Sequence, residues 1–257
     1  MISPSWRWAA AKATGTSHIR VGKGCDDFGG CTVVQDAGAE ALVVVVSDGA
    51  GSAEHSAIGS RLVTMRFVRL ASKFFKSGNE VKSLTQQTVL EWLDDIRDNI
   101  SNTAKDLGAT PRDFAATLVA GLVTATHASF IHVGDGAAVF RLVDREEWQI
   151  GSWPAHGEYA STTYFVTDDP EPNVTVSHVD GAIAEISIFT DGLERLVLNF
   201  SDQTPFAPFF NKVFGAFNAK SRRRDRNISR QLSILLESQS VCEKTDDDKT
   251  IFLVKRV

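Results

Sequence analysis

Residues 41–52, ALVVVVSDGAGS, join a run of apolar residues to an aspartate and a glycine-rich turn. The consecutive valines favour a buried β-strand, because β-branched side chains fit a pleated sheet. Gly49 and Gly51 allow the chain to turn tightly just after Asp48. We therefore predict a strand that ends in a carboxylate at the rim of a sheet, where the carboxylate can reach solvent or an ion.

Two long helices are predicted after this turn. Apolar residues recur at helical spacing over residues 56–75, and a second stripe with the same spacing runs from Val89 to Leu107. The second helix is expected to stop near Gly108, since glycine commonly ends a helix and Pro111 lies just beyond.

Most of the remaining chain has the pattern of strands. Residues 116–152 are expected to form consecutive strands of an antiparallel meander, and residues 164–192 continue the β-rich pattern. Two further helical segments are predicted within residues 205–240, and residues 250–257 close the sequence as a strand. This order of strands and helices predicts an α+β layered fold.

The composition is that of an ordinary soluble globular protein. The chain has 257 residues, of which 43% are hydrophobic and 23% charged, and no linker-like stretch divides it, so we expect a single domain over residues 1–257. The net charge of -5 argues against a nucleic-acid binder. The three cysteines have no CxxC spacing, which excludes a zinc signature and a disulfide framework. We see no signal peptide and no membrane span, and expect a cytoplasmic protein.

Aspartates stand where predicted strands end. Asp48, Asp135 and Asp191 each come before a glycine at such a junction, and runs of aspartates occupy residues 26–27 and 246–248. Asp-Gly alone is a common turn dipeptide, but turn chemistry does not require consecutive aspartates. Clustered carboxylates repel one another unless a cation lies between them, and hard oxygen ligands suit Mg²⁺ or Mn²⁺. The pattern predicts a divalent metal site and leaves the reaction open.

Five segments occur in a recognisable order along the chain: GTSHIRVGKGCDDF, VVSDGAGS, ATLVAGLVTATHASFIHVGDGAAVFRL, IFTDGLERL and DDKTIFLV. This order resembles the type 2C, metal-dependent protein phosphatases of the PPM family, in particular a bacterial subgroup. The resemblance implies a four-layer αββα sandwich with two central antiparallel sheets flanked by helices. It also implies a serine/threonine phosphatase that uses two divalent cations, Mn²⁺ or Mg²⁺, to activate water against phosphoserine and phosphothreonine esters.

The resemblance carries site residues over position by position. Asp48 matches the aspartate that bridges both metals, and Gly49 offers a backbone carbonyl to one of them. Asp48 and Asp191 are thus the predicted catalytic residues, acting through the metal-activated water. Asp135 matches a residue with a more structural role. The complete predicted metal set is Asp26, Asp27, Asp48, Gly49, Asp191 and Asp247.

The sequence departs from the family pattern at two positions. Ala50 replaces a histidine that is a candidate general acid, and Gly22 replaces an arginine that binds substrate phosphate. We expect no single histidine to become an essential general acid. Arg20 and Lys23 are the candidate phosphate-binding cations, and Arg20 is preferred because an extended strand would put it on the same face as Gly22. No acid of a third metal site is evident.

Two other functions remain open at the level of sequence. A phosphatase-like module without activity could bind phosphoproteins or regulate a kinase, although such a module need not keep the predicted ligands. A metal-dependent hydrolase of small phosphate esters would look the same in sequence. The resemblance implies phosphorylated proteins as partners, the targets of a serine/threonine kinase, with neither nucleic acid nor membrane.

Overall fold

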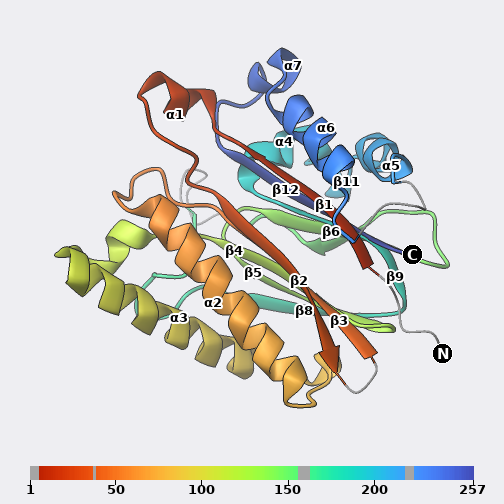
Figure 1. Ribbon diagram of the computed structural model, residues 1–257, viewed down its shortest axis with the longest axis horizontal. Coiled ribbons are helices and arrows are strands. Elements are labelled where there is room, and N and C mark those ends of the chain that lie inside the picture. The colour runs from red at the N-terminus through yellow and green to blue at the C-terminus, as the bar shows by residue number, and fades with distance from the viewer. Residues whose placement is uncertain (1–5, 37–38, 156–162, 218–222) are drawn as a thin grey trace.

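Two five-stranded antiparallel sheets form the centre of the fold (Figure 1). The computed structural model describes residues 6–36, 39–155, 163–217 and 223–257. The first sheet has the order β1 (Trp6–Ala13), β12 (Lys249–Arg256), β9 (Ile183–Phe189), β6 (Ala137–Leu142) and β7 (Gln149–Ser152). The second has the order β2 (Phe28–Asp36), β3 (Ala39–Ser47), β4 (Leu118–Val123), β5 (His127–Val133) and β8 (Thr175–Asp180).

Helices cover the outer face of each sheet, as Figure 1 shows. α2 (Ser56–Lys76) and α3 (Gln86–Leu107) pack on the second sheet, where Phe67 and Trp92 belong to the same core as Val43 and Val45 of β3. On the first sheet lie α5 (Ala207–Gly215) and α6 (Arg226–Leu236). The shorter elements are α1 (Thr16–Arg20), η1 (Val81–Ser83), η2 (Pro111–Phe114), η3 (Asp191–Leu193), α4 (Glu194–Val197), β10 (Leu198–Asn199), β11 (Thr204–Pro205) and α7 (Gln239–Cys242).

The valine run of β3 is buried on both sides. Val43 and Val45 belong to the core beneath α2 and α3, whereas Val44 and Val46 belong to the core between the two sheets. A strand covered on both faces has no polar side, which explains why its sequence is continuously apolar rather than alternating. The predicted four-layer αββα sandwich is confirmed.

Three local predictions were wrong. The meander does not continue through β5 and β6, because the chain leaves the second sheet after β5 and enters the first. Residues 164–169 form no strand. Residues 16–20 form helix α1 rather than part of an extended strand, and Gly22 follows it with φ of 70°, a left-handed conformation that favours glycine. Within the described residues, no helix is both long and apolar enough to cross a membrane.

Candidate active site

Strand register brings the predicted aspartates to one end of the two sheets. Phe28 pairs with Ser47 in the second sheet, so Asp27 and Asp48 lie side by side at its rim. In the first sheet Phe189 pairs with both Ile251 and Ala137. The segments just beyond these pairs carry the aspartates at positions 191, 247 and 135, which therefore meet at the same rim.

The side chains form what we call the acid cluster, defined as Asp27, Asp48, Asp135, Asp191 and Asp247. One carboxylate oxygen from each of Asp48, Asp135 and Asp191 lies within 4.8 Å of the others. The Asp48 carboxyl group lies beside that of Asp27, and the Thr190 hydroxyl donates to Asp27 Oδ2 at 2.7 Å. Both sheets therefore contribute to one site.

Burial and mutual repulsion raise the pKa of these carboxyl groups. Desolvation is the largest cause for Asp48 and Asp191, whose pKa values lie well above the ordinary range, and neighbouring carboxylates add to the shift. Burial likewise raises the pKa of Asp27 to about 6 and that of Asp247 above its usual value. Without a cation, this cluster favours bound protons.

The cluster also contains carboxylate oxygens that lack donors. Asp27 Oδ1 and Asp191 Oδ1 are buried and have no hydrogen-bond partner among the residues that the structure describes. Such oxygens are costly to bury unless a proton or a cation compensates them. A set of oxygen donors of this kind fits a hard divalent cation.

Gly49 is required by its surroundings. A Cβ at this position would lie 2.6 Å from the backbone oxygen of Ser56, and Gly49 is bridged to Ala116 on the other side. The chain after Asp48 is thus held close to both segments, with no room for a side chain. This placement keeps the Gly49 backbone next to Asp48 of the acid cluster.

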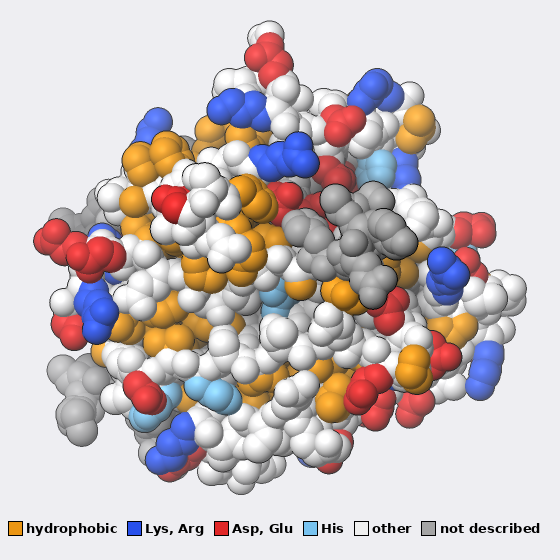
Figure 2. Space-filling view, turned by 180° about the vertical axis from the view of Figure 1, so that it is seen from behind, with side chains coloured by type: hydrophobic (Ala, Val, Ile, Leu, Met, Phe, Trp, Pro, Cys, Tyr) orange, Lys and Arg blue, Asp and Glu red, His pale blue; other side chains and the backbone are white. Residues whose placement is uncertain are grey.

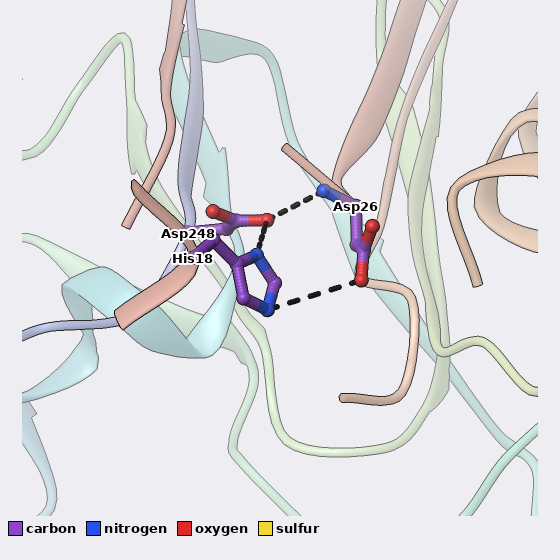
Figure 3. Close-up of side chains that lie close together, drawn as sticks. All are labelled: His18, Asp26 and Asp248. Carbon is purple, nitrogen blue, oxygen red and sulfur yellow. Dashed lines mark hydrogen bonds and ion pairs between the residues drawn. The ribbon is translucent and has the colours of Figure 1, made fainter. Parts of the chain in front are cut away.

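Asp26 belongs to a different cluster, formed with His18 and Asp248 (Figure 3). Asp26 Oδ2 lies 2.5 Å from Lys23 Nζ and accepts from the Ser56 hydroxyl at 2.6 Å. Both carboxylates of Asp26 and Asp248 have donors, whereas the acid cluster leaves Asp27 Oδ1 and Asp191 Oδ1 without one among the described residues. The consecutive aspartates 26–27 and 247–248 therefore divide, with one member of each pair facing each cluster.

The two candidate phosphate-binding cations occupy different environments. Arg20 pairs with Asp246 at 3.1 Å, and both side chains are about two-thirds exposed. The Lys23 side chain is one-third exposed and reaches Asp26 directly, beside Ser56 at the entrance to α2. The structure thus places Lys23, not Arg20, against a predicted site residue.

Two acids contribute more than the sequence suggested. Asp135 lies within the acid cluster rather than apart from it, and the Thr163 hydroxyl donates to its Oδ2. Glu194, at the start of α4, lies near Asp191 and Asp135, and burial raises its pKa to about 7. Its spacing of three residues from Asp191 across a helical turn was the available signal.

Comparison with known proteins identifies the family. Residues 14–237 match the family model described as protein phosphatase 2C. The chain is 32% identical over 256 residues to serine/threonine-protein phosphatase 3 of Escherichia coli (strain K12), covering 97% of this chain and 98% of that protein. The chain belongs to the protein phosphatase 2C family. The function predicted from the sequence, a metal-dependent serine/threonine phosphatase, is confirmed at the level of this family.

Solved structures support the same fold. The phosphatase Stp1 from Staphylococcus aureus superimposes with a TM-score of 0.64 at 15% identity, over 99% of this chain and 96% of that one. The catalytic domain of the phosphatase PstP, solved with two manganese ions, gives a TM-score of 0.63 at 15% identity, over 99% and 100% of the chains.

Proposed function

We propose that the acid cluster holds the two divalent cations, Mn²⁺ or Mg²⁺, with which this protein phosphatase 2C relative hydrolyses phosphoserine and phosphothreonine. The observation that carries the proposal is the convergence of aspartates from separate strands, with buried oxygens that lack donors within the described residues. The direct ligands we propose are Asp27, Asp48, Asp191, Asp247 and the Gly49 carbonyl.

Each protein group has a defined part in this proposal. Asp48 directly follows β3 and interacts with both Asp27, from the second sheet, and Asp191, from the first, which suits a carboxylate shared by two cations. Bound cations would neutralise phosphoryl charge and lower the pKa of nearby water. Asp26 was predicted as a ligand, but its carboxylate is paired with Lys23, so we place it outside the direct set.

A hollow beside the acid cluster favours an extended substrate. Its volume is about 1110 Å³, and it is lined by residues of α3, η2 and the segment after Thr163. Thr163 lines the hollow and also donates to Asp135. Ala115, another lining residue, accepts a hydrogen bond from the Ala50 backbone, one residue beyond Gly49. The hollow thus adjoins the site and offers room for the polypeptide around a phosphoresidue, which a small ester would not need.

The surface charge agrees with protein partners. On the face drawn in Figure 2, Lys and Arg side chains are scattered, and Asp and Glu side chains lie among them. A basic patch of the kind that binds nucleic acid is not seen on that face, among the side chains that the structure describes. We propose that the substrates are phosphoproteins, targets of a serine/threonine kinase, and that the whole chain acts as one domain in the cytoplasm.

A hydrolysis assay tests the proposal. The protein is stripped with EDTA and given Mn²⁺, Mg²⁺ or no metal, and phosphate release is measured from a phosphothreonine peptide and from p-nitrophenyl phosphate. We expect activity only with metal, and a higher kcat/KM for the peptide. Full activity without metal would refute the metal site. Turnover of small esters alone would favour the small-ester hydrolase, and metal binding without any turnover would favour the inactive module.

A further inference from the structure

The carboxylate of Asp248 gathers donors from three separate segments. Its Oδ1 accepts from the backbone of Gly15 at 2.6 Å. Its Oδ2 accepts from the backbone of Asp26 at 2.5 Å and lies 3.0 Å from Nδ1 of His18 (Figure 3). The Asp248 side chain is only 1% exposed. A buried carboxylate with three donors is strongly tied to its surroundings, because each bond to a charged acceptor is stronger than a neutral one.

The position of Asp248 links this network to the acid cluster. Asp247, a proposed metal ligand, is its direct neighbour, and the bonded Asp26 amide belongs to the residue before Asp27. Asp248 thereby joins the start of β12 to the entry of β2. An added Cβ at Gly15 would overlap the backbone at Asp246, so the loop between β1 and α1 lies directly against this segment.

His18 supports the same arrangement from α1. Its ring reaches Asp248 through Nδ1, while Nε2 lies 3.9 Å from Asp26 Oδ2. Its backbone oxygen accepts from the Lys23 amide at 2.9 Å, and Lys23 Nζ pairs with Asp26. The side chain is 15% exposed. His18 therefore contacts Asp248 and Lys23 and lies close to Asp26.

We propose that Asp248 and His18 are positioning residues, which set Asp27 and Asp247 at the distance that metal binding requires through the Nδ1–Asp248 bond. The inference rests on the proposed metal site. It requires a hydrogen-bond donor at Nδ1 and no proton transfer by His18, which agrees with the expectation that no histidine is an essential general acid. Groups that orient metal ligands in this way typically matter about 10–100-fold in metal affinity or activity.

Two substitutions of His18 separate positioning from proton transfer. His18→Asn puts an amide donor near the Nδ1 position, whereas His18→Gln puts it near Nε2 and removes the donor to Asp248. We expect His18→Gln and Asp248→Asn to weaken Mn²⁺ binding, measured by calorimetry, and to lower kcat by about 10–100-fold. His18→Asn should recover most of both. Asp246→Asn, in the same aspartate run but about two-thirds exposed, is the matched control.

Contrary results are distinct from failure of the proposed function. Equal, wild-type Mn²⁺ affinity in His18→Gln and Asp248→Asn would overturn the inference, even if the enzyme proved to act on other esters. Equal losses in both His18 variants, large for phosphoserine and small for p-nitrophenyl phosphate, would assign proton transfer at Nε2 instead. If Asp248→Asn fails to fold, the His18 pair alone decides. Absence of metal-dependent hydrolysis in the unmodified protein would refute the proposed function and leave the affinities to test positioning.

Discussion

At the residue scale, Asp48 and Asp191 concentrate the negative charge of the site. Both are half-buried, and desolvation and neighbouring carboxylates raise their pKa values, so each costs the metal-free fold free energy that a cation would recover. We predict that Asp48→Asn and Asp191→Asn each lower kcat at saturating Mn²⁺ by at least about 100-fold. The melting temperature in EDTA should stay equal or rise, since one repulsive charge is gone.

The control for this prediction is Asp246→Asn, which should change neither quantity, because the Asp246 side chain is exposed and bonds only Arg20 among the described residues. A near-normal kcat in either cluster variant would remove that aspartate from the set of ligands.

The phosphate-binding cation can be tested in the same way. Lys23 Nζ lies 2.5 Å from Asp26 Oδ2, whereas Arg20 forms an exposed ion pair with Asp246. We predict that Lys23→Ala raises KM for a phosphopeptide by about 10-fold or more, the scale of a hydrogen bond to a charged group. Arg20→Ala should change KM by less than about 2-fold, since exposed ion pairs contribute little. A larger increase in KM for Arg20→Ala than for Lys23→Ala would support Arg20, the residue preferred from the sequence.

The sequence indicated that several aspartates would meet at one rim, because each of them follows or precedes a recognisable strand, but it put Asp26 among them and left Asp135 apart. It could not show which way Asp26 and Asp27 face, since that depends on hydrogen bonds from Lys23, Ser56 and Thr190, far apart in the chain. The parity argument for Arg20 assumed an extended strand. Helix α1 removes that assumption, because the Ser17 amide and hydroxyl donate to the Asp246 backbone oxygen and the Gly15 amide donates to the Asp248 side chain instead.

At the scale of elements, α2 depends on one close approach. Gly59, in its second turn, lies so near the backbone oxygen of Phe114 in η2 that an added Cβ would overlap it. We predict that Gly59→Ala lowers the free energy of unfolding by about 1–3 kcal/mol, the range for overpacking, despite alanine's better helix propensity. Gly215→Ala, at a helical glycine with open space around it, is the control and should be neutral or stabilising. Equal denaturation midpoints for both variants would contradict this prediction.

The periodicity of apolar residues predicted the helices and most strands, but it did not predict which strands pair with one another in each sheet. The apolar run of β3 predicted a buried strand, and its two-sided burial is the physical reason. The passage from β5 to β6 looked like a hairpin in sequence because Gly134 and Gly136 are good turn residues. The chain instead crosses to the other sheet there, and only tertiary packing decides between these outcomes.

At the scale of the molecule, metal binding should be coupled to pH. Asp27 and Glu194 have pKa values raised to about 6 and about 7, so in the metal-free fold they hold protons at pH values where ordinary carboxyl groups are ionised. A cation bound by Asp27 must displace its proton, and the positive charge also disfavours the proton on nearby Glu194. We predict that Mn²⁺ affinity falls as the pH is lowered from about 7.5 to about 5.5, measured by calorimetry in several buffers. Affinity that stays constant over this interval would contradict the prediction.

Metal affinity is a better readout here than thermal stability alone. Raised carboxyl pKa values make the metal-free fold lose stability as the pH rises from about 4 through about 7. His132 acts in the opposite direction. Burial lowers its pKa to about 4, so its contribution is lost as the pH falls below its ordinary value. These two pH dependences act in opposite directions on the melting temperature. Comparing melting temperatures with and without Mn²⁺ at each pH isolates the contribution of the acid cluster.

The placement of β12 determines when, during translation, the active site can form. β12 lies inside its sheet, between β1 and β9, and the residues directly before it, Asp247 and Asp248, meet residues 26–27 at the site. A ribosome must therefore translate past codon 248 before the site can exist. Truncated chains that end before residue 248 would lack the complete site and would therefore not dephosphorylate substrates.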